Sequence, residues 1–314
     1  MIKNFRIAFF GSTEFSIPSL EKLVKEGLIP TLVITQPDRK KGRKQRFLPT
    51  PVKVEAKKMG IPIFSPTSIN EQRSVVFLQS QKIDLFVVVA YGEFLNPRIR
   101  AIPNIFCINV HPSLLPAFRG ANPIRSSIAS GLKKTGNTIF KIEAKMDKGA
   151  IIDRDFIDIS PEDNYSTLSQ RLSKQGANLL HKSVVNIAKG EYALEPQNHS
   201  LATYTSKISK KTTKIDWNQN APQIHNFVRS LSEEPGAWST FDGRAIKILE
   251  TRETDVLSTK QPGSVVEISR LDGIQVSTKS FNINVLWVKP EGKKAMFSYS
   301  FSLGRSIGVG DRFE

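Results

Sequence analysis

Strand-like and helix-like patterns alternate through the first half of this 314-residue chain. Five short apolar segments are separated by stretches in which apolar residues recur with helical spacing, as around Ile17, Leu20 and Val24. The segments are Phe5–Phe10, Thr31–Thr35, Ile61–Phe64, Asp84–Ala90 and Ile105–Val110. This alternation is typical of βαβ units, so we expect an α/β domain with an open, mostly parallel, Rossmann-like sheet.

The later part of the chain predicts a second domain. Two more strand-like segments, Asn137–Ile142 and Ala150–Ile157, and a helical pattern from Tyr165 to Lys189 complete the first domain. From Gly190 to Lys214 the chain is polar and basic, which is typical of a linker. Beyond it, Ala221–Leu231 has a helical pattern, and short alternating segments with turn signals at Asp242-Gly243 and Asp272-Gly273 predict a small β-barrel, which we expect to be OB-like. We place the first domain at 1–189, the linker at 190–208 and the C-terminal domain at 209–314.

The composition of the chain argues against a membrane protein, a secreted protein and a thiolate zinc site. The longest apolar run, Leu85 to Ala90, is far shorter than the ~20 residues of a membrane span, and the N-terminal stretch is not typical of a signal peptide. The single cysteine, Cys107, cannot form an internal disulfide and leaves no thiolate cluster for zinc. We therefore expect a cytoplasmic protein without a membrane partner or a bound metal, and Cys107 as a small buried hydrophobe.

The chain is strongly basic, with 45 basic and 29 acidic residues and a formal net charge of +16. Nucleic acid, a phosphorylated metabolite, an anionic membrane surface or simple solubility would each account for this charge. The densest run is RKKGRKQR, from Arg39 to Arg46, directly after the second predicted strand. A run of this kind is usually a solvated surface, but here it follows the carboxyl end of a strand.

Asn109 and His111 lie two residues apart at the end of the fifth predicted strand, so their side chains point to the same face. In open α/β sheets, ligands bind outside the carboxyl ends of the strands. An amide NH₂ and an imidazole N–H can both donate to the oxyanion that develops in acyl transfer. The spacing alone, however, favours a structural histidine at a capped strand end.

Longer motifs carry a resemblance to a known family. The string NVHPSLLP, from Asn109 to Pro116, followed by FRGANPI, resembles the signature of enzymes that use 10-formyltetrahydrofolate. The similarity continues, in matching order, through TQPDRKKGRKQ, VVVAYGEFL, KMDKGAII, LATYTSKIS and PGAWSTFDGRAIKI, and the chain thus resembles the methionyl-tRNA formyltransferase family over nearly its whole length. The resemblance implies transfer of a formyl group from 10-formyltetrahydrofolate, a co-substrate, to the α-amino group of methionyl initiator tRNA, without a metal.

The resemblance also implies roles for particular residues. The catalytic trio is Asn109, His111 and Asp147; for Asp147 the spacing alone favours a turn aspartate before Gly149. The folate-binding residues are Ser113, Leu114, Leu115, Pro116, Val88, Ala90, Tyr91 and Gly92, and the last four also fit an ordinary core strand. The tRNA-binding residues are Arg39, Lys40, Lys41, Arg43, Lys44 and Arg46, with Arg43 ranked first. The charge of the linker lysines Lys207, Lys210 and Lys211 gives a second possible contact with the phosphate backbone, the alternative being that the second domain is only a spacer.

The reaction needs little beyond these groups. An α-amino group has a pKa of ~7.7–8.0, so a useful neutral fraction exists at pH 7. Asn109 and His111 are expected to stabilise the oxyanion, and losing one such donor typically costs ~10²–10³ in rate. His111, held by Asp147, would relay a proton as a base and then as an acid.

Three alternatives remain open at this point. Phosphoribosylglycinamide formyltransferases share the first domain but are shorter, nucleotide-sugar formyltransferases carry a comparable second domain, and a nucleic-acid-binding relative could have lost catalysis. The basic run and the net charge favour tRNA, and the intact trio argues against a non-catalytic relative. Two departures from the family stand out, namely Asn122 in place of a usual alanine and the stretch EEPGAWS.

Other residues suggest no chemistry. Gly11 is a single glycine after the first strand, short of a dinucleotide-binding motif, and is expected in a tight turn. The histidines His181, His199 and His225 lack metal-ligand spacing and are expected to be structural or solvated. We expect the protein to be a monomer.

Overall fold

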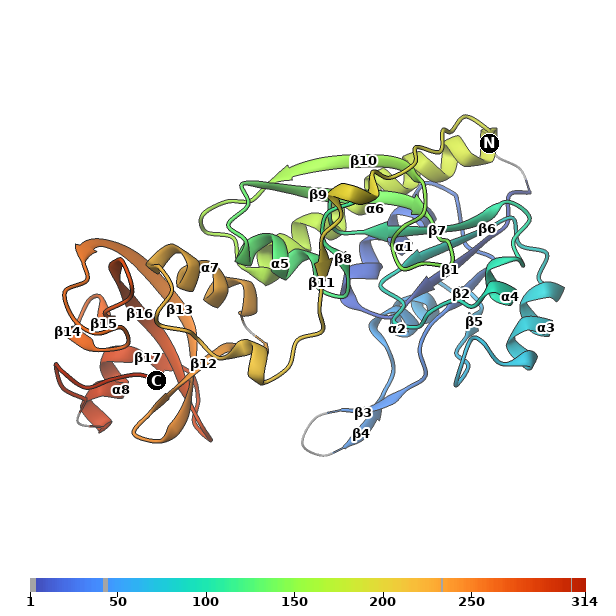
Figure 1. Ribbon diagram of the computed structural model, residues 1–314. Helices are drawn as coiled ribbons and strands as arrows, with labels where there is room; N and C mark the ends of the chain where they lie inside the picture. The colour runs from blue at the N-terminus through green and yellow to red at the C-terminus, as the bar shows by residue number, and fades with distance from the viewer. Residues whose placement is uncertain (1–3, 42–44, 233, 306) are drawn as a thin grey trace. The chain divides into compact units, whose positions relative to one another are not determined.

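The computed structural model describes residues 4–41, 45–232, 234–305 and 307–314 and divides into two compact units (Figure 1). Unit 1 comprises Met1–Gly120, Lys134–Asp158 and Ser169–Tyr204. Unit 2 comprises Ala121–Lys133, Ile159–Leu168 and Thr205–Glu314. Each unit has its own sheet and its own hydrophobic core.

Unit 1 is built on a seven-stranded sheet in the order β10-β9-β7-β6-β1-β2-β5. The strands are β1 (Ile7–Gly11), β2 (Leu32–Ile34), β5 (Ile63–Phe64), β6 (Leu85–Val89), β7 (Phe106–His111), β9 (Lys134–Lys141) and β10 (Ile151–Asp158). The strands from β7 to β5 run parallel, whereas β9 and β10 add on antiparallel. The carboxyl ends of the parallel strands therefore share one edge of the sheet.

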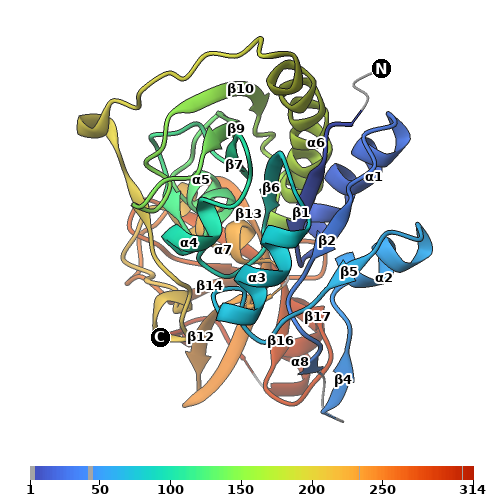
Figure 2. The same ribbon diagram turned by 90° about the vertical axis from the view of Figure 1, so that its right-hand side faces the viewer.

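Helices cover both faces of this sheet, as Figure 2 shows for α1 and α6 on one side and α3 and α4 on the other. The helices of unit 1 are α1 (Ile17–Lys25), α2 (Pro51–Lys58), α3 (Gln72–Ser80), α4 (Pro97–Arg100) and α6 (Tyr165–Lys189), whose first turn belongs to unit 2. Successive strand residues alternate between the two cores, with Phe9 in the core under α1, α2 and α6 and Phe10 in the core under α3 and α4. Cys107 lies in the latter core, so Asn109 and His111 face the same side.

Short elements complete unit 1. They are η1 (Glu14–Ser16), β3 (Arg39–Lys41), β4 (Arg46–Leu48), β8 (Arg119–Gly120), η2 (His199–Leu201) and β11 (Tyr204–Thr205), whose last residue falls in unit 2. Strands β3 and β4 pair as an antiparallel hairpin at the carboxyl end of β2. The sequence did not predict this hairpin, because its basic residues show no apolar alternation.

Unit 2 contains a separate antiparallel sheet in the order β12-β13-β16-β15-β14, with β17 paired to β16. The strands are β12 (Ala237–Phe241), β13 (Arg244–Leu257), β14 (Val265–Ser269), β15 (Gly273–Val276), β16 (Phe281–Pro290) and β17 (Met296–Phe297). The helical segments are α5 (Pro123–Ala129), η3 (Lys211–Thr213), α7 (Ala221–Leu231) and α8 (Ser298–Arg305). The predicted turn Asp242-Gly243 lies between the paired strands β12 and β13, and Asp272-Gly273 lies where the chain enters β15 after β14.

The predicted fold is confirmed as an α/β unit with a mostly parallel sheet and a separate antiparallel-sheet unit. The predicted helical patterns at Tyr165–Lys189 and Ala221–Leu231 coincide with α6 and α7. Helix α7 begins at a capping box in which Asn220 and Gln223 satisfy each other's backbone N–H groups.

The division into units differs from the domain boundaries drawn from the sequence at 1–189, 190–208 and 209–314. Residues 190–204, expected in the linker, belong to unit 1, where Glu195 pairs with Ile151 through two backbone hydrogen bonds. Residues 121–133 belong to unit 2, where Arg125 donates to the carbonyl of Ser230 at 2.7 Å. The functional domain boundaries stay a prediction.

The helices of the described ranges include none with both the length and the apolar character that a bilayer crossing requires.

His225 on α7 makes the stability of unit 2 sensitive to acid. Burial, together with the positive charge of Arg229, lowers the pKa of His225 from 6.5 to about 4. The unfolded chain then binds a proton between these two pH values whereas the folded chain does not, so stability is lost as the pH falls from about 6.5 to 4. We expect a loss of about 2 kcal/mol between pH 7 and pH 4.5, measured by urea unfolding at both pH values. An equal loss in His225→Gln would contradict this assignment.

Candidate active site

Strand β7 brings Asn109 and His111 to the carboxyl edge of the parallel sheet. The backbone neighbours of Asn109 are Val88 on β6 and Phe140 on β9. The Asn109 side chain is half-buried, and the hydrogen bonds found among the described residues do not involve its amide group. Its NH₂ group is therefore available as a donor at the end of the strand.

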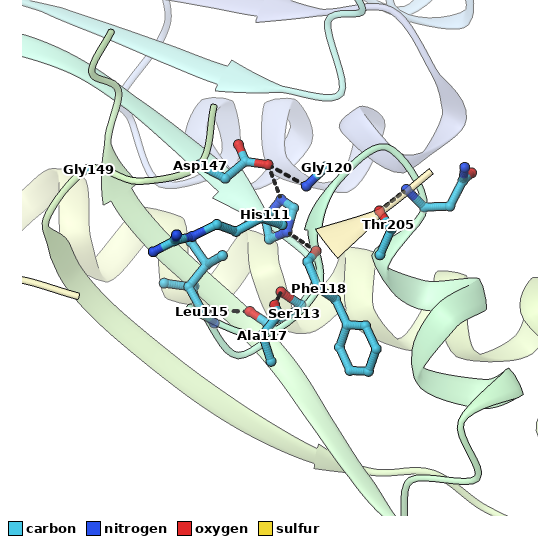
Figure 3. A network of polar contacts seen from close by, with 12 residues as sticks. His111, Ser113, Leu115, Ala117, Phe118, Gly120, Asp147, Gly149 and Thr205 are labelled. Carbon is cyan, nitrogen blue, oxygen red and sulfur yellow. Dashed lines mark hydrogen bonds and ion pairs between the residues drawn. The ribbon is translucent and has the colours of Figure 1, made fainter. Parts of the chain in front are cut away.

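The chain turns sharply after His111, and hydrogen bonds fix the turn at several points (Figure 3). The Ser113 hydroxyl donates to the carbonyl of Ala117 at 2.6 Å. The Thr138 hydroxyl donates to the carbonyl of Ser113 at 2.7 Å and accepts from the Leu115 N–H at 3.1 Å. Of the predicted folate-binding residues in this turn, Ser113 and Leu115 are buried, and Leu114 and Pro116 are half-buried. Thr138 on β9 thus fixes the backbone of this turn through two hydrogen bonds.

Asp147 lies beside His111, in the loop between β9 and β10. Its Oδ2 is 3.9 Å from Nδ1 of His111 and accepts a hydrogen bond of 2.7 Å from the Gly120 N–H. Its backbone is in the left-handed region, with φ of 52°. The spacing in the sequence did not indicate this proximity, which only the family resemblance had implied.

The two ring nitrogens of His111 have different surroundings. Nε2 is 3.1 Å from the carbonyl of Phe118, and because a carbonyl can only accept, Nε2 carries the proton. Figure 3 shows the ring between this carbonyl and the Asp147 carboxylate. Burial lowers the pKa of His111, and the carboxylate and the Phe118 hydrogen bond oppose that shift. His111 is therefore neutral at pH 7, with the lone pair of Nδ1 toward Asp147.

The segment from Val88 to Gly92 lies at the end of β6, next to β7. Val88 and Tyr91 are buried in the core under α3 and α4, so their side chains serve the core. Ala90 and Gly92 are exposed, with φ of 46° and 91°. The carbonyl of Tyr91 accepts a hydrogen bond of 2.9 Å from Ser12 after β1. Ala90 and Gly92 are therefore the residues of this segment that are exposed, together with their backbone.

The basic run after β2 lies on the same edge of the sheet as Asn109. Arg39, Lys40 and Arg46 are exposed on the hairpin of β3 and β4. Arg39 donates to the side chain of Gln36 at 2.9 Å, and the ammonium of Lys40 lies 5.6 Å from the ring centre of Phe47. The backbone of Lys41 ends β3, whereas Arg43 and Lys44 lie outside the described residues.

In unit 2, the three lysines predicted to bind tRNA, Lys207, Lys210 and Lys211, are all exposed. The ammonium groups of Lys210 and Lys214 lie 5.7 and 5.6 Å from the ring centre of Trp238. The Trp238 indole donates to the carbonyl of Lys210 at 2.8 Å. Two cations on one aromatic ring form a cationic, partly aromatic surface.

Sequence reasoning missed Arg119 and Gln197, which are buried beside the Asp147 loop. It also assigned no contact to His199, whose Nδ1 lies 2.9 Å from Nη2 of Arg119.

Of the predictions for two other residues, the one for Cys107 is confirmed and the one for Gly11 is wrong. Cys107 is buried, as expected, and burial raises its pKa to about 12. Gly11 lies within β1, where an added Cβ would come within 2.8 Å of Phe9, so close packing rather than a tight turn explains it.

Within the part of the chain that the structure describes, no three His, Cys, Asp or Glu side chains are grouped so that they could hold a metal ion.

Comparison with known proteins finds matches over nearly the whole of this chain. A family model described as formyl transferase matches residues 5–184, and one described as formyl transferase, C-terminal domain, matches residues 207–306. The methionyl-tRNA formyltransferase of Bacillus subtilis (strain 168) is 38% identical over 307 residues, which cover 98% of this chain and 96% of that protein. That of Bacillus pumilus (strain SAFR-032) is 36% identical and covers 98% and 97%.

The chain belongs to the formyl transferase family. Solved structures agree with this fold. HypX from Aquifex aeolicus, determined with tetrahydrofolic acid, has a TM-score of 0.67 at 14% identity over 98% of this chain and 49% of that chain. WlaRD, a sugar 3N-formyl transferase determined with dTDP and 5-N-formyl-THF, has a TM-score of 0.66 at 20% identity, covering 92% and 99%. Both solved structures thus share the fold of this chain.

Proposed function

We propose that this formyl transferase moves the formyl group of 10-formyltetrahydrofolate to the α-amino group of methionyl initiator tRNA. The observation that carries the proposal is the juxtaposition at the end of β7 of an available Asn109 amide with a neutral His111 beside Asp147. The substrate follows from the relatives at 36% to 38% identity, whose names specify methionyl-tRNA. The product would serve translation initiation in the cytoplasm.

In the proposed first step, the neutral amine attacks the formyl carbon, and the new C–N bond forms as the carbonyl oxygen becomes an oxyanion. Asn109 donates its amide N–H to that oxygen. His111 is a poorer donor there than we expected from the sequence, because its Nε2 proton is engaged by the Phe118 carbonyl. Asn109 is therefore the main side-chain donor for the oxyanion.

The proton leaves the amine through Nδ1 of His111, which carries the free lone pair of the ring. The resulting imidazolium is stabilised by the Asp147 carboxylate, whose Oδ2 is 3.9 Å away. That distance is too long for a hydrogen bond in the present state, so the pair acts through charge until Nδ1 is protonated. The same proton then passes to the folate nitrogen as the bond from the formyl carbon to that nitrogen breaks.

The folate is proposed to bind along the turn Ser113–Pro116 and the exposed backbone from Ala90 to Gly92. Both lie at the carboxyl ends of adjacent strands, β7 and β6, which is where open α/β sheets bind ligands. The hydrogen bonds of Thr138 keep the turn rigid, so its peptide groups are held in place for a flat ligand.

We further propose that unit 2 is an OB-like barrel that contacts the tRNA backbone in a monomeric enzyme. Its chain end supports closure of the sheet, because Phe313 bridges Phe241 of β12 and Arg312 bridges Ser264 just before β14. Lys207, Lys210 and Lys211 supply charge for nucleic acid, and Trp238, which lies beside Lys210, supplies an aromatic surface.

A direct assay decides between substrates. The purified protein is incubated with 10-formyltetrahydrofolate and, separately, with methionyl-tRNA, a glycinamide ribonucleotide or an amino-sugar nucleotide. We expect formylated methionyl-tRNA as the main product. Formylation of either small nucleotide substrate alone would overturn the proposal, and no product with any of them would favour a nucleic-acid-binding relative without activity.

Removing charge from the hairpin should weaken tRNA use selectively. For Lys40→Ala combined with Arg43→Ala we expect the KM for methionyl-tRNA to rise about a hundredfold, because each of the two lost contacts to phosphate costs about 1.5 kcal/mol. The slope of log affinity against log salt should fall by roughly 0.7 to 0.9 per contact. The KM for the folate should not change.

The matched control is Lys293→Ala with Lys294→Ala, which removes the same charge from an exposed turn of unit 2. An equal rise in KM for the two double variants would mean that only net charge matters, and the hairpin would then have no specific role.

A further inference from the structure

The loop that carries Asp147 is held by the side chain of Gln197, a residue 50 positions later in the chain. The Gln197 Nε2 donates to the carbonyl of Asp147 at 2.9 Å and to the carbonyl of Gly149 at 2.7 Å. Gln197 is buried, with 7% of its surface exposed. The side-chain amide of Gln197 thus donates both of its protons to the two carbonyls on either side of Lys148.

Gln197 is in turn oriented by Arg119, which is completely buried on β8. Nη2 and Nε of Arg119 donate to Oε1 of Gln197 at 2.6 and 3.2 Å. An amide oxygen and nitrogen differ in the bonds that they make, and the guanidinium can only donate, so Oε1 must face Arg119 and Nε2 must face the loop. Arg119 therefore determines which way the Gln197 amide points.

The same short strand holds the other end of Asp147. Gly120, which follows Arg119, donates its N–H to Oδ2 of Asp147 (Figure 3). The backbone carbonyl of Asp147 is therefore bound through Gln197 and its carboxylate through Gly120, and both contacts lead back to β8. Strand β8 is itself anchored, because the Arg119 N–H donates to the carbonyl of Thr203 at 2.9 Å.

Asp147 needs such support. Its left-handed φ of 52° is a conformation that costs about 1–3 kcal/mol for a residue other than glycine. The loop also packs closely, since a Cβ added at Gly149 would come within 1.7 Å of the Lys141 carbonyl. A loop held this closely keeps the carboxylate at one distance from the imidazole, whereas a free loop would relax.

We propose that Gln197 and Arg119 are positioning residues that fix the Asp147 carboxylate beside His111 for formyl transfer. This inference rests on the proposed function and deepens it. Both side chains are buried, so they act through the Asp147 loop, and the chemical step is therefore the step that depends on them.

The decisive variant is Gln197→Glu. A glutamate keeps the oxygen that accepts from Arg119 and the size of the side chain, but it cannot donate to Asp147 and Gly149. If Gln197 only satisfied a buried arginine, this variant would keep full activity. We expect instead that kcat falls about 10²-fold, as for a misplaced catalytic group, with the KM of both substrates unchanged.

A second measurement follows the charge directly. The chain has four histidines, so their ring signals can be titrated by NMR in protein labelled at histidine. Because the Asp147 carboxylate raises the pKa of His111, its displacement should lower that pKa. The uncharged variant Gln197→Met is used for this titration, because a glutamate would add a charge of its own.

The control is Glu195→Gln, two residues earlier, where an exposed carboxylate pairs with Arg154. It should retain wild-type kcat and the wild-type pKa of His111. Wild-type kcat in Gln197→Glu, together with an unshifted His111 in Gln197→Met, would overturn the positioning role. The proposed function fails separately, if the unmodified protein does not formylate methionyl-tRNA.

Discussion

Replacing Asp147 by asparagine is expected to lower kcat for formyl transfer by about 10²- to 10⁴-fold, the usual contribution of a proton-transfer group. Asparagine has the same shape and retains an oxygen for the Gly120 N–H, so the loop can keep its place. What is lost is the negative charge 3.9 Å from Nδ1 of His111. Without it the imidazolium is less stable in its buried site, and His111 becomes a weaker base.

The measurement is single-turnover formylation with both substrates saturating, accompanied by thermal unfolding to confirm that the variant folds. Asp155→Asn removes an exposed carboxylate on β10 of the same unit and should leave kcat unchanged. Turnover by Asp147→Asn at the wild-type rate would refute the proton relay.

Asn109→Ala is the second change with a large expected effect, a fall in kcat of about 10²- to 10³-fold. The Asn109 amide makes no hydrogen bond to any other described residue, so its removal costs the folded enzyme little in the resting state. The loss arises as the oxyanion forms and finds no side-chain donor. We expect the KM values to change much less than kcat, because the interaction strengthens only in the transition state.

Asn109→Asp provides a sharper test at the same position. It places an acceptor, charged when ionised, where a donor is required, and it should be slower than Asn109→Ala. Asn104→Ala is the control, since it removes an exposed amide just before the start of β7 that binds Asp84. If Asn109→Ala raised only the KM for folate, Asn109 would be a binding residue rather than an oxyanion donor.

Local patterns in the sequence predicted the parts of this molecule that depend on neighbouring residues. The spacing of Asn109 and His111 gave their common face, and helical periodicity gave the extents of α6 and α7. Asp147 is different, because nothing in its surroundings tells a turn aspartate from a catalytic one. The family resemblance supplied that residue, and the structure then placed it beside His111.

The contact between Arg119 and Gln197 could not be predicted from local sequence patterns. They are 78 positions apart, and each is an ordinary polar residue in a segment without periodicity. Their burial depends on the return of the later segment to unit 1, where Glu195 pairs with Ile151 and Thr203 accepts from Arg119, and no turn signal or apolar pattern predicts this return. For the same reason the stretch after Gly190 was predicted as a linker, although it contributes hydrogen bonds to unit 1.

The hydrogen bonds from Gln197 to the Asp147 loop affect when the newly synthesised enzyme can become active. During translation, Asn109, His111 and Asp147 all leave the ribosome well before Gln197 and Thr203. At roughly 5–20 residues per second, the 50 residues from Asp147 to Gln197 take several seconds to synthesise. In that interval the nascent chain has all three reacting side chains and lacks the segment that holds the carboxylate, so the site matures only as the last part of unit 1 emerges.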